Sequence, residues 1–184
     1  MPTTSAPTTR RWTREEYHDL ADAGFLSKDD RVELIDGDII QLRPQNTPHA
    51  VAVRLVRRAL QHVFPSDTYM VDEQLPLALA PDSEPDPDVA VVEGQPRDFL
   101  DDHPTKAVLV VEVADASLQF DRGKKQALYA RHNLPQYWIV HLTDRQLEVY
   151  RDPSGPSYAE RTMVEEGKTV ALRDHTVAVS DLLP

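Results

Sequence analysis

An acidic residue stands inside the most continuous apolar run of the chain. The run covers residues 106–114 (KAVLVVEVA), and Glu112 interrupts it near its end. A run of this kind, rich in valine, is typical of a central strand that is buried on both faces of a sheet. An ionised carboxylate buried there without compensation would cost several kcal/mol. Glu112 therefore needs a partner, either a basic side chain or a metal ion.

Asp88 poses the same problem at the start of a second apolar strand, residues 88–92. Two carboxylates on neighbouring strands repel each other unless a proton or a divalent cation lies between them. Ligation by oxygen alone favours a hard ion such as Mg²⁺ or Mn²⁺. Lys125 follows Glu112 by thirteen residues, on a predicted helix that can pack back across the sheet.

Local signals predict the N-terminal half of the fold. Thr13 and Glu16 form a capping box, which predicts a helix over residues 13–23. The dipeptide Asp36-Gly37 between two apolar stretches predicts a β-hairpin over residues 31–40. A second helix is predicted over residues 48–63, with proline in its first turn.

The remaining elements alternate between strand and helix. They are strands at 69–79, 88–92, 106–114, 136–142 and 146–151, a helix at 119–133, and two weaker strands and a short helix at the C-terminus. This order indicates an α/β fold with a mixed sheet. Neither a repeat nor a second compositional block divides the chain, so we expect a single domain over residues 12–184.

The acidic residues are concentrated in the middle of the chain. The formal net charge is −11, and the window 72–121 contains thirteen acids and two bases, so this window carries the whole excess. The other 134 residues balance at 18 acids and 18 bases. Such a chain lacks the large positive field of a nucleic-acid coat protein or a basic membrane-surface protein.

Several classes of protein are excluded by what the sequence lacks. It has no cysteine, which excludes disulfides, zinc–thiolate sites and thiol catalysis. We find no glycine-rich phosphate loop, so no nucleotide cofactor is expected, and no GxSxG or HExxH motif. No apolar run reaches the ~20 residues of a membrane span. We therefore expect a cytoplasmic protein without a membrane partner, with residues 1–11 as a flexible tail that carries no secretory signal.

The pattern of Glu33, Pro87-Asp88-Val89, Glu112 and a displaced Lys125 resembles the PD-(D/E)XK restriction-endonuclease-like superfamily. More narrowly, it is similar to the bacterial Uma-type branch of that superfamily. The resemblance covers about residues 12–183. The stretches that carry it are 31–37, 87–92, 110–114, 121–130 and 134–138.

The resemblance implies an α/β core in which helices flank a central mixed β-sheet, with an N-terminal helix and a β-hairpin. It implies that Asp88, Glu112 and the backbone carbonyl of Val113 hold Mg²⁺ or Mn²⁺. Lys125 would then orient the attacking water or stabilise the charge that develops on the phosphate, and Glu33 would contact a metal-bound water or a second ion.

This sequence departs from the superfamily pattern at one point. The residue two positions after Glu112 is Ala114 rather than lysine. The branch pattern places the lysine on the helix, four residues before Tyr129, which favours Lys125 over Lys124 without excluding Lys124. The resemblance further implies His49 and Gln74 as accessory site residues, and Tyr129 shares a helical face with Lys125 at i, i+4. Basic residues flank the acidic window on both sides, and we expect them to contact substrate phosphates: Arg54, Arg57, Arg58, Arg122 and Lys124.

The residues alone leave structural alternatives open. Glu112 can sit in an ion pair, Asp88 can cap backbone amides, and Glu33 can face solvent on its strand. Three functions follow from these alternatives. The first is a Mg²⁺-dependent endonuclease that acts on DNA as a homodimer. The others are a catalytically silent nuclease fold used for binding or assembly, and a metal-dependent hydrolase of a substrate other than nucleic acid.

Overall fold

A six-stranded mixed sheet forms the centre of the computed structural model, which describes residues 8–27 and 29–184. The strand order is β3-β4-β5-β6-β7-β8, with β5 and β6 parallel and every other pair antiparallel. The strands are β3 (Tyr69–Glu73), β4 (Val89–Glu93), β5 (Leu109–Ala114), β6 (Gln136–His141), β7 (Gln146–Ser154) and β8 (Ser157–Glu165). All six residues of β5 are buried, which confirms the predicted central strand.

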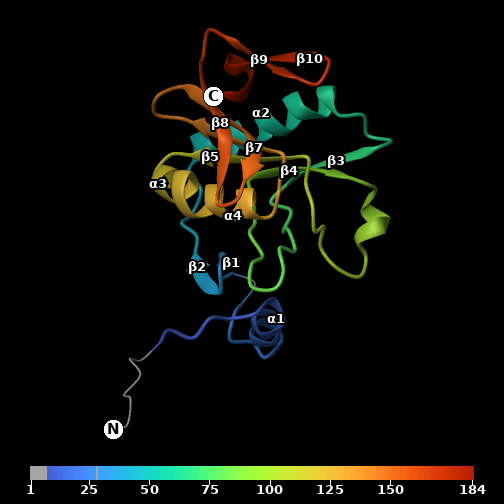
Figure 1. The fold of residues 1–184 in the computed structure, drawn as a ribbon, viewed down its shortest axis with the longest axis vertical. Coiled ribbons are helices and arrows are strands. Elements are labelled where there is room, and N and C mark those ends of the chain that lie inside the picture. The colour runs from blue at the N-terminus through green and yellow to red at the C-terminus, as the bar shows by residue number, and fades with distance from the viewer. Residues whose placement is uncertain (1–7, 28) are drawn as a thin grey trace.

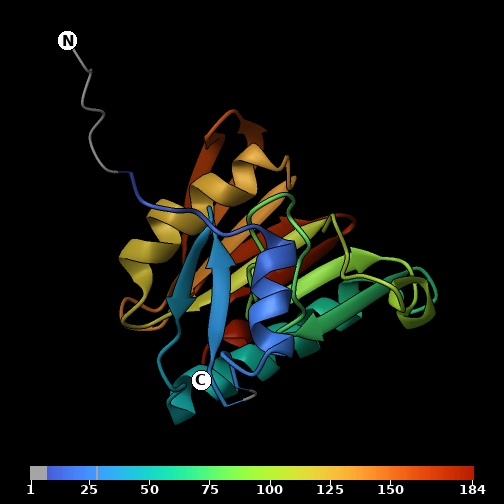
Figure 2. The ribbon, with the colours of Figure 1, turned by 90° about the horizontal axis from the view of Figure 1, so that it is seen from below.

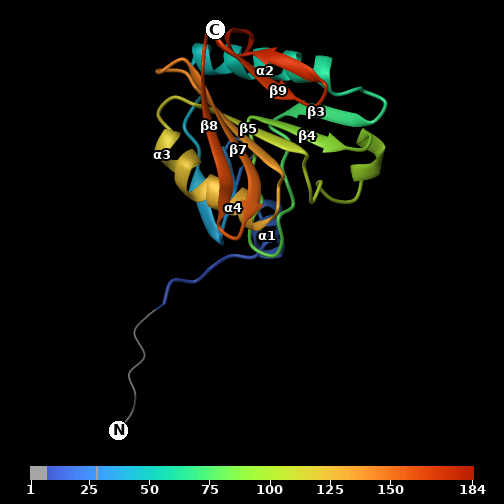
Figure 3. The same ribbon diagram turned by 45° about the horizontal axis from the view of Figure 1, so that its top comes forward.

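Helices cover both faces of this sheet (Figure 1). On one face lies α2 (Thr47–Val63), which begins at its N-cap Asn46. On the other face lies a continuous helical stretch made of α3 (Leu118–Phe120), the π-helical turn η2 (Asp121–Lys125) and α4 (Gln126–Arg131). Figure 3 shows the two helical layers on either side of the strands. The predicted α/β fold with a mixed sheet between helices is confirmed.

The alternation of β5 side chains creates two hydrophobic cores. Val111 and Val113 pack toward α2 in one core, and Val110 and Ala114 pack toward α4 in the other. Because side chains alternate along a strand, Glu112 shares the α4 face with Val110 and Ala114. The sheet therefore delivers the Glu112 carboxylate beneath the helical stretch that carries Lys125.

Two small hairpins and a helix complete the described chain. The hairpin β1 (Val32–Ile35) and β2 (Asp38–Gln41) turns at Asp36-Gly37 as predicted, with Gly37 at a φ of +75°. Helix α1 (Arg14–Asp22) has the predicted capping box and lies beside this hairpin (Figure 2). The C-terminal hairpin of β9 (Thr169–Leu172) and β10 (His175–Ala178) lies at the opposite end of the molecule (Figure 1). Short 3₁₀ turns occur at η1 (Pro96–Phe99) and η3 (Val179–Leu182).

The predicted elements differ from the structure at several points, including a strand expected at 106–114 that begins at Leu109. The strand expected at 69–79 ends at Glu73, because Gln74 adopts a φ of +53° that breaks the extended ladder. The helix expected at 119–133 contains the π turn instead of regular α geometry throughout. Three strands rather than two weaker ones follow β7, because β8 pairs with β7 along its length as a hairpin.

The N-terminal prediction is tested only in part. Residues 1–7 of the tail expected over 1–11 lie outside the described residues, and residues 8–11 have no regular secondary structure. None of the helices within residues 8–27 and 29–184 combines the length and hydrophobicity needed to cross a membrane.

Candidate active site

A pocket of about 340 Å³ opens where the β1–β2 hairpin meets the central strands. It lies between the segment that joins β2 to α2, the ends of β4 and β5, and the π turn. Its lining includes the predicted site residues Glu33, His49, Gln74, Asp88, Glu112 and Lys125. Six residues that are separated by up to 92 positions in the sequence therefore share one cavity.

Lys125 lies at the buried end of the pocket between two glutamates. Its Nζ atom is 3.0 Å from Glu112 Oε1 and 3.1 Å from Glu33 Oε2. Burial lowers the pKa of this lysine, but the neighbouring carboxylates, led by Glu112, more than offset that effect and raise the pKa well above its usual value. Lys125 is therefore a cation. Lys124 instead pairs with Asp38 at the exposed surface, so Lys125 is the lysine that faces the pocket.

Glu112 is held by two donors on the covering helix. Besides Lys125, the Tyr129 hydroxyl donates to Glu112 Oε1 at 2.8 Å. Burial raises the pKa of Glu112 well above its usual value, and the charge of Lys125 opposes that shift. The sequence alone allowed Glu112 to form a structural ion pair, and the structure shows this pair with Lys125. The Glu112 side chain also lines the pocket.

Glu33 is 1% exposed, so the solvent-facing alternative for this residue is wrong. The hairpin turns its side chain inward, where Oε2 accepts from the Asp86 backbone N–H at 3.1 Å and lies 3.1 Å from Lys125 Nζ. Its other oxygen, Oε1, is buried without a hydrogen-bond partner among the described residues, as is Oδ1 of Asp86. Burial raises the pKa of Asp86 to about 6. Buried carboxylate oxygens are almost always satisfied, so these two can accept a donor or a cation.

Asp88 is fixed at the end of the β4–β5 ladder. Because Val89 pairs with Val111, the same register continued by one step sets Asp88 opposite Glu112, on the same face of the sheet. Asp88 Oδ2 accepts from the Val113 backbone N–H at 2.8 Å and lies 3.2 Å from His49 Nε2. Asp88 therefore accepts from a backbone amide, as the structural alternative for this residue expected, but the amide belongs to Val113 on the neighbouring strand.

His49 supports Asp88 from the first turn of α2. Burial lowers the pKa of His49, while the hydrogen bond to Asp88 and its charge raise it, and the net pKa lies above the usual histidine value. Gln74 also reaches the pocket, because the left-handed backbone at this residue ends β3 and turns the chain toward the cavity.

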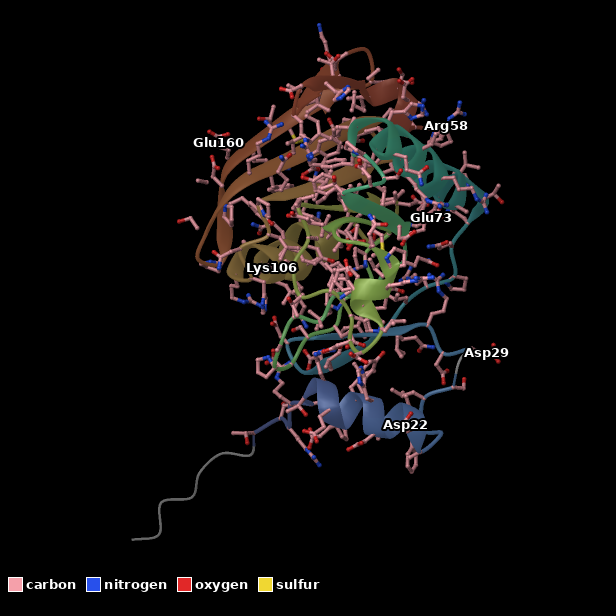
Figure 4. The ribbon with its side chains drawn as sticks, turned by 90° about the vertical axis from the view of Figure 1, so that its right-hand side faces the viewer. Asp22, Asp29, Arg58, Glu73, Lys106 and Glu160 are labelled. Carbon is pink, nitrogen blue, oxygen red and sulfur yellow. The ribbon has the colours of Figure 1, made fainter. Side chains whose placement is uncertain are left out.

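The predicted phosphate contacts do not line this pocket. Arg122 pairs with Glu148, and Arg57 lies 3.5 Å from Glu73. Arg54 is exposed, while Arg58 lines a separate cavity between α2 and the C-terminal hairpin, at the upper end of the molecule in Figure 4. Helix α2 contributes His49 of its first turn to the pocket, whereas its arginines lie one or more turns further along the helix.

Five further charged residues line the pocket that the sequence did not single out as site residues. They are Arg31, Arg43, Asp86, Asp115 and Asp121. Asp121 accepts from Ser117 Oγ at 2.6 Å, and burial raises its pKa to about 6. Its position four residues before Lys125 is a usable signal, because residues i and i+4 share one face of a helix. Arg31 and Arg43 have no such signal, because both lie outside regular helices and strands, in short segments without periodic hydrophobic spacing.

The donor set of the pocket fits a divalent cation. Asp88 and Glu112 face each other across β4 and β5, and carboxylates with unpaired or protonation-prone oxygens surround them. Among residues 8–27 and 29–184, no group of three histidine or acidic side chains converges closely enough to form a complete metal cage. Asp88 and Glu112 supply two carboxylate ligands of the kind that Mg²⁺ accepts, and this ion usually keeps several water ligands.

A comparison with solved structures shows that another protein shares this fold. A crystal structure from Anabaena variabilis, described as that of a "putative nuclease", superposes with a TM-score of 0.72 over 93% of this chain and 97% of that one, at 17% identity. The match to the type IIG restriction endonuclease BpuSI covers 73% of this chain and 14% of the BpuSI chain at 18% identity. Its TM-score of 0.41 is too low to show a shared fold. No curated protein gives a significant match.

The family follows from the sequence itself. The model of the Uma2 family, described as "Putative restriction endonuclease", matches residues 14–180. This chain belongs to the Uma2 family, and the predicted family resemblance is confirmed.

Proposed function

We propose that this protein is a Mg²⁺- or Mn²⁺-dependent endonuclease that hydrolyses phosphodiester bonds of DNA. The observation that carries the proposal is the pocket in which Asp88 and Glu112 oppose each other beside the buried cation of Lys125. Membership of the Uma2 family and the nuclease-type fold support the reaction class.

The metal would be held by Asp88, Glu112 and the Val113 carbonyl, and would supply an activated water and neutralisation of phosphate charge. The protein's own residues prepare the site for this chemistry. His49 and the Val113 amide hold Asp88 in one orientation. Lys125 has three N–H donors, and one of them donates to Glu112. A remaining donor would stabilise charge on a phosphoryl oxygen.

The net charge of −11 is compatible with a polyanionic substrate because of where the bases lie. Arg31 and Arg43 line the same pocket as the acids, and they replace the α2 arginines as our candidates for phosphate contacts. A divalent ion would offset two further negative charges. Since phosphate contacts set the salt dependence of binding, few of them predict weak binding that falls gently with salt.

The experiment is a cleavage assay on supercoiled plasmid with Mg²⁺ or Mn²⁺. We expect nicked or linear product from the wild type and none from Asp88→Ala. Asp101→Ala is the matched control, because it removes an exposed acid outside the pocket. Equal activity of wild type and Asp88→Ala, or no cleavage with any metal, would overturn the proposal for DNA.

Metal binding can be tested separately by calorimetry with Mn²⁺. The proposal expects binding by the wild type that is lost in Glu112→Gln. Absence of binding by the wild type would favour a silent nuclease fold used for assembly. A protein with one pocket per chain would need two copies to cut both strands of DNA. We therefore also propose a homodimer, which sedimentation analysis would reveal as a species of twice the chain mass.

A further inference from the structure

The π turn that presents Lys125 is tied to the sheet at a second, fully buried acid. Glu148 on β7 is 0% exposed. Its Oε1 accepts from Arg122 Nε at 2.9 Å, and its Oε2 accepts from Arg161 at 2.9 Å and from the Tyr150 hydroxyl at 2.7 Å. A buried carboxylate with two guanidinium partners and a hydroxyl is fully compensated, and these partners, offsetting its burial, lower the pKa of Glu148.

The strand register relates this acid to the active pocket. Glu148 pairs with Ile139 on β6, and Ile139 pairs with Glu112 on β5. Glu148 and Glu112 therefore point to the same face of the sheet, two strand spacings or about 9.5 Å apart. One short segment, residues 121–125, therefore places Arg122 on Glu148 and Lys125 on Glu112.

The backbone of this segment needs such fixation. The turn closes through the Gln126 N–H bonded to the Asp121 carbonyl, a π-type hydrogen bond of the kind found in single-turn bulges. The Tyr137 hydroxyl donates to the same carbonyl at 3.1 Å, so it adds a second tie from the sheet. Bulges of this type interrupt regular helices and persist where surrounding contacts determine them.

We propose that Glu148 and Arg122 are positioning residues, which hold the π turn across β5 to β7 and thereby place Lys125 between Glu33 and Glu112. Arg122 acts through this anchor and does not contact substrate. The kinetic part of the inference rests on the proposed function, whereas the structural part does not.

The chain offers a matched pair of variants. Arg122→Ala and Arg161→Ala each remove one guanidinium from the same carboxylate, but only Arg122 stands on the segment of Lys125. The first readout is acetylation of Lys125 by acetic anhydride, followed by mass spectrometry. We expect faster labelling of Lys125 in Arg122→Ala and wild-type protection in Arg161→Ala, with amide hydrogen exchange in residues 121–125 accelerated only in the former.

The second readout is plasmid cleavage. A displaced catalytic group lowers turnover on the order of 10²-fold, so kcat should fall by that amount in Arg122→Ala with little change in KM. Arg161→Ala should retain wild-type kcat. Equal Lys125 labelling in the two variants, or full protection in both, would overturn the anchor. If the wild type cleaves nothing, the proposed function fails, but the labelling experiment still decides the role of Arg122.

Discussion

Removal of the buried lysine should produce a pH-dependent loss of stability. Lys125→Met keeps the length of the side chain and removes its charge, which leaves Glu33 and Glu112 with 0% and 4% exposed side chains and no cation between them. Breaking a buried ion pair from one side costs about 3–5 kcal/mol. For a domain of this size, that loss lowers the melting temperature by roughly 6–20 °C.

The direction of the pH effect follows from the pKa values. The raised pKa of Lys125 means that its contribution is fully present below its unfolded pKa of about 10.4 and is constant through neutral pH. In the variant, burial raises the pKa of Glu112 without the opposing lysine charge, so the folded state takes up a proton as the pH falls. The loss in free energy of unfolding relative to the wild type should therefore be largest at about pH 8. It should shrink toward about pH 5, near the unfolded pKa of glutamate.

The assay is chemical denaturation of wild type and variant at both pH values. Lys124→Met is the control, because this exposed lysine pairs with Asp38 at the surface and its loss should cost no more than about 1 kcal/mol. A Lys125→Met deficit as small as that of the control, or one that does not change between the two pH values, would refute the reasoning.

Three further predictions test individual contacts. Tyr129→Phe removes the hydroxyl donor to Glu112 and should cost about 1.5–3 kcal/mol in urea denaturation, so an unchanged midpoint would contradict the hydrogen bond. Gly37→Ala should cost about 1–3 kcal/mol, because φ is +75° and the new Cβ would lie 2.6 Å from Arg11 Cβ; a gain in melting temperature would show that the turn relaxes freely. Trp138→Ala empties a fully buried site and should cost about 3–5 kcal/mol, and a loss below ~1 kcal/mol would mean that the core refills the space.

Much of the fold could be predicted because its signals are local. The capping box at Thr13 and the Asp36-Gly37 turn specify their elements within a few residues. The apolar run around Glu112 identifies the central strand, since only a strand covered on both sides is apolar on both faces. The acid inside that run also points to the site, because a carboxylate in a buried strand requires a compensating partner.

The missing parts depend on contacts between distant segments. Arg122 looks like a solvated helical residue until Glu148, 26 positions later, is placed beneath it by the register of β6 and β7. The π turn has no sequence period of its own, and it accompanies the contacts of Arg122 and Lys125 with acids on two different strands. Asp86 and Arg31 enter the pocket through loops, whose course is set by packing rather than by propensity.

The buried pocket has a consequence for how the protein is made. Its acids emerge from the ribosome first, beginning with Glu33, and its lysine emerges last. The turn that carries the lysine is anchored on β7, which ends at Ser154. A nascent chain that stops before this strand already contains Lys125, but it lacks Glu148, the acid that anchors the turn. The anchor of the turn therefore forms only after β7 has been synthesised, which is later than the synthesis of every residue that lines the pocket.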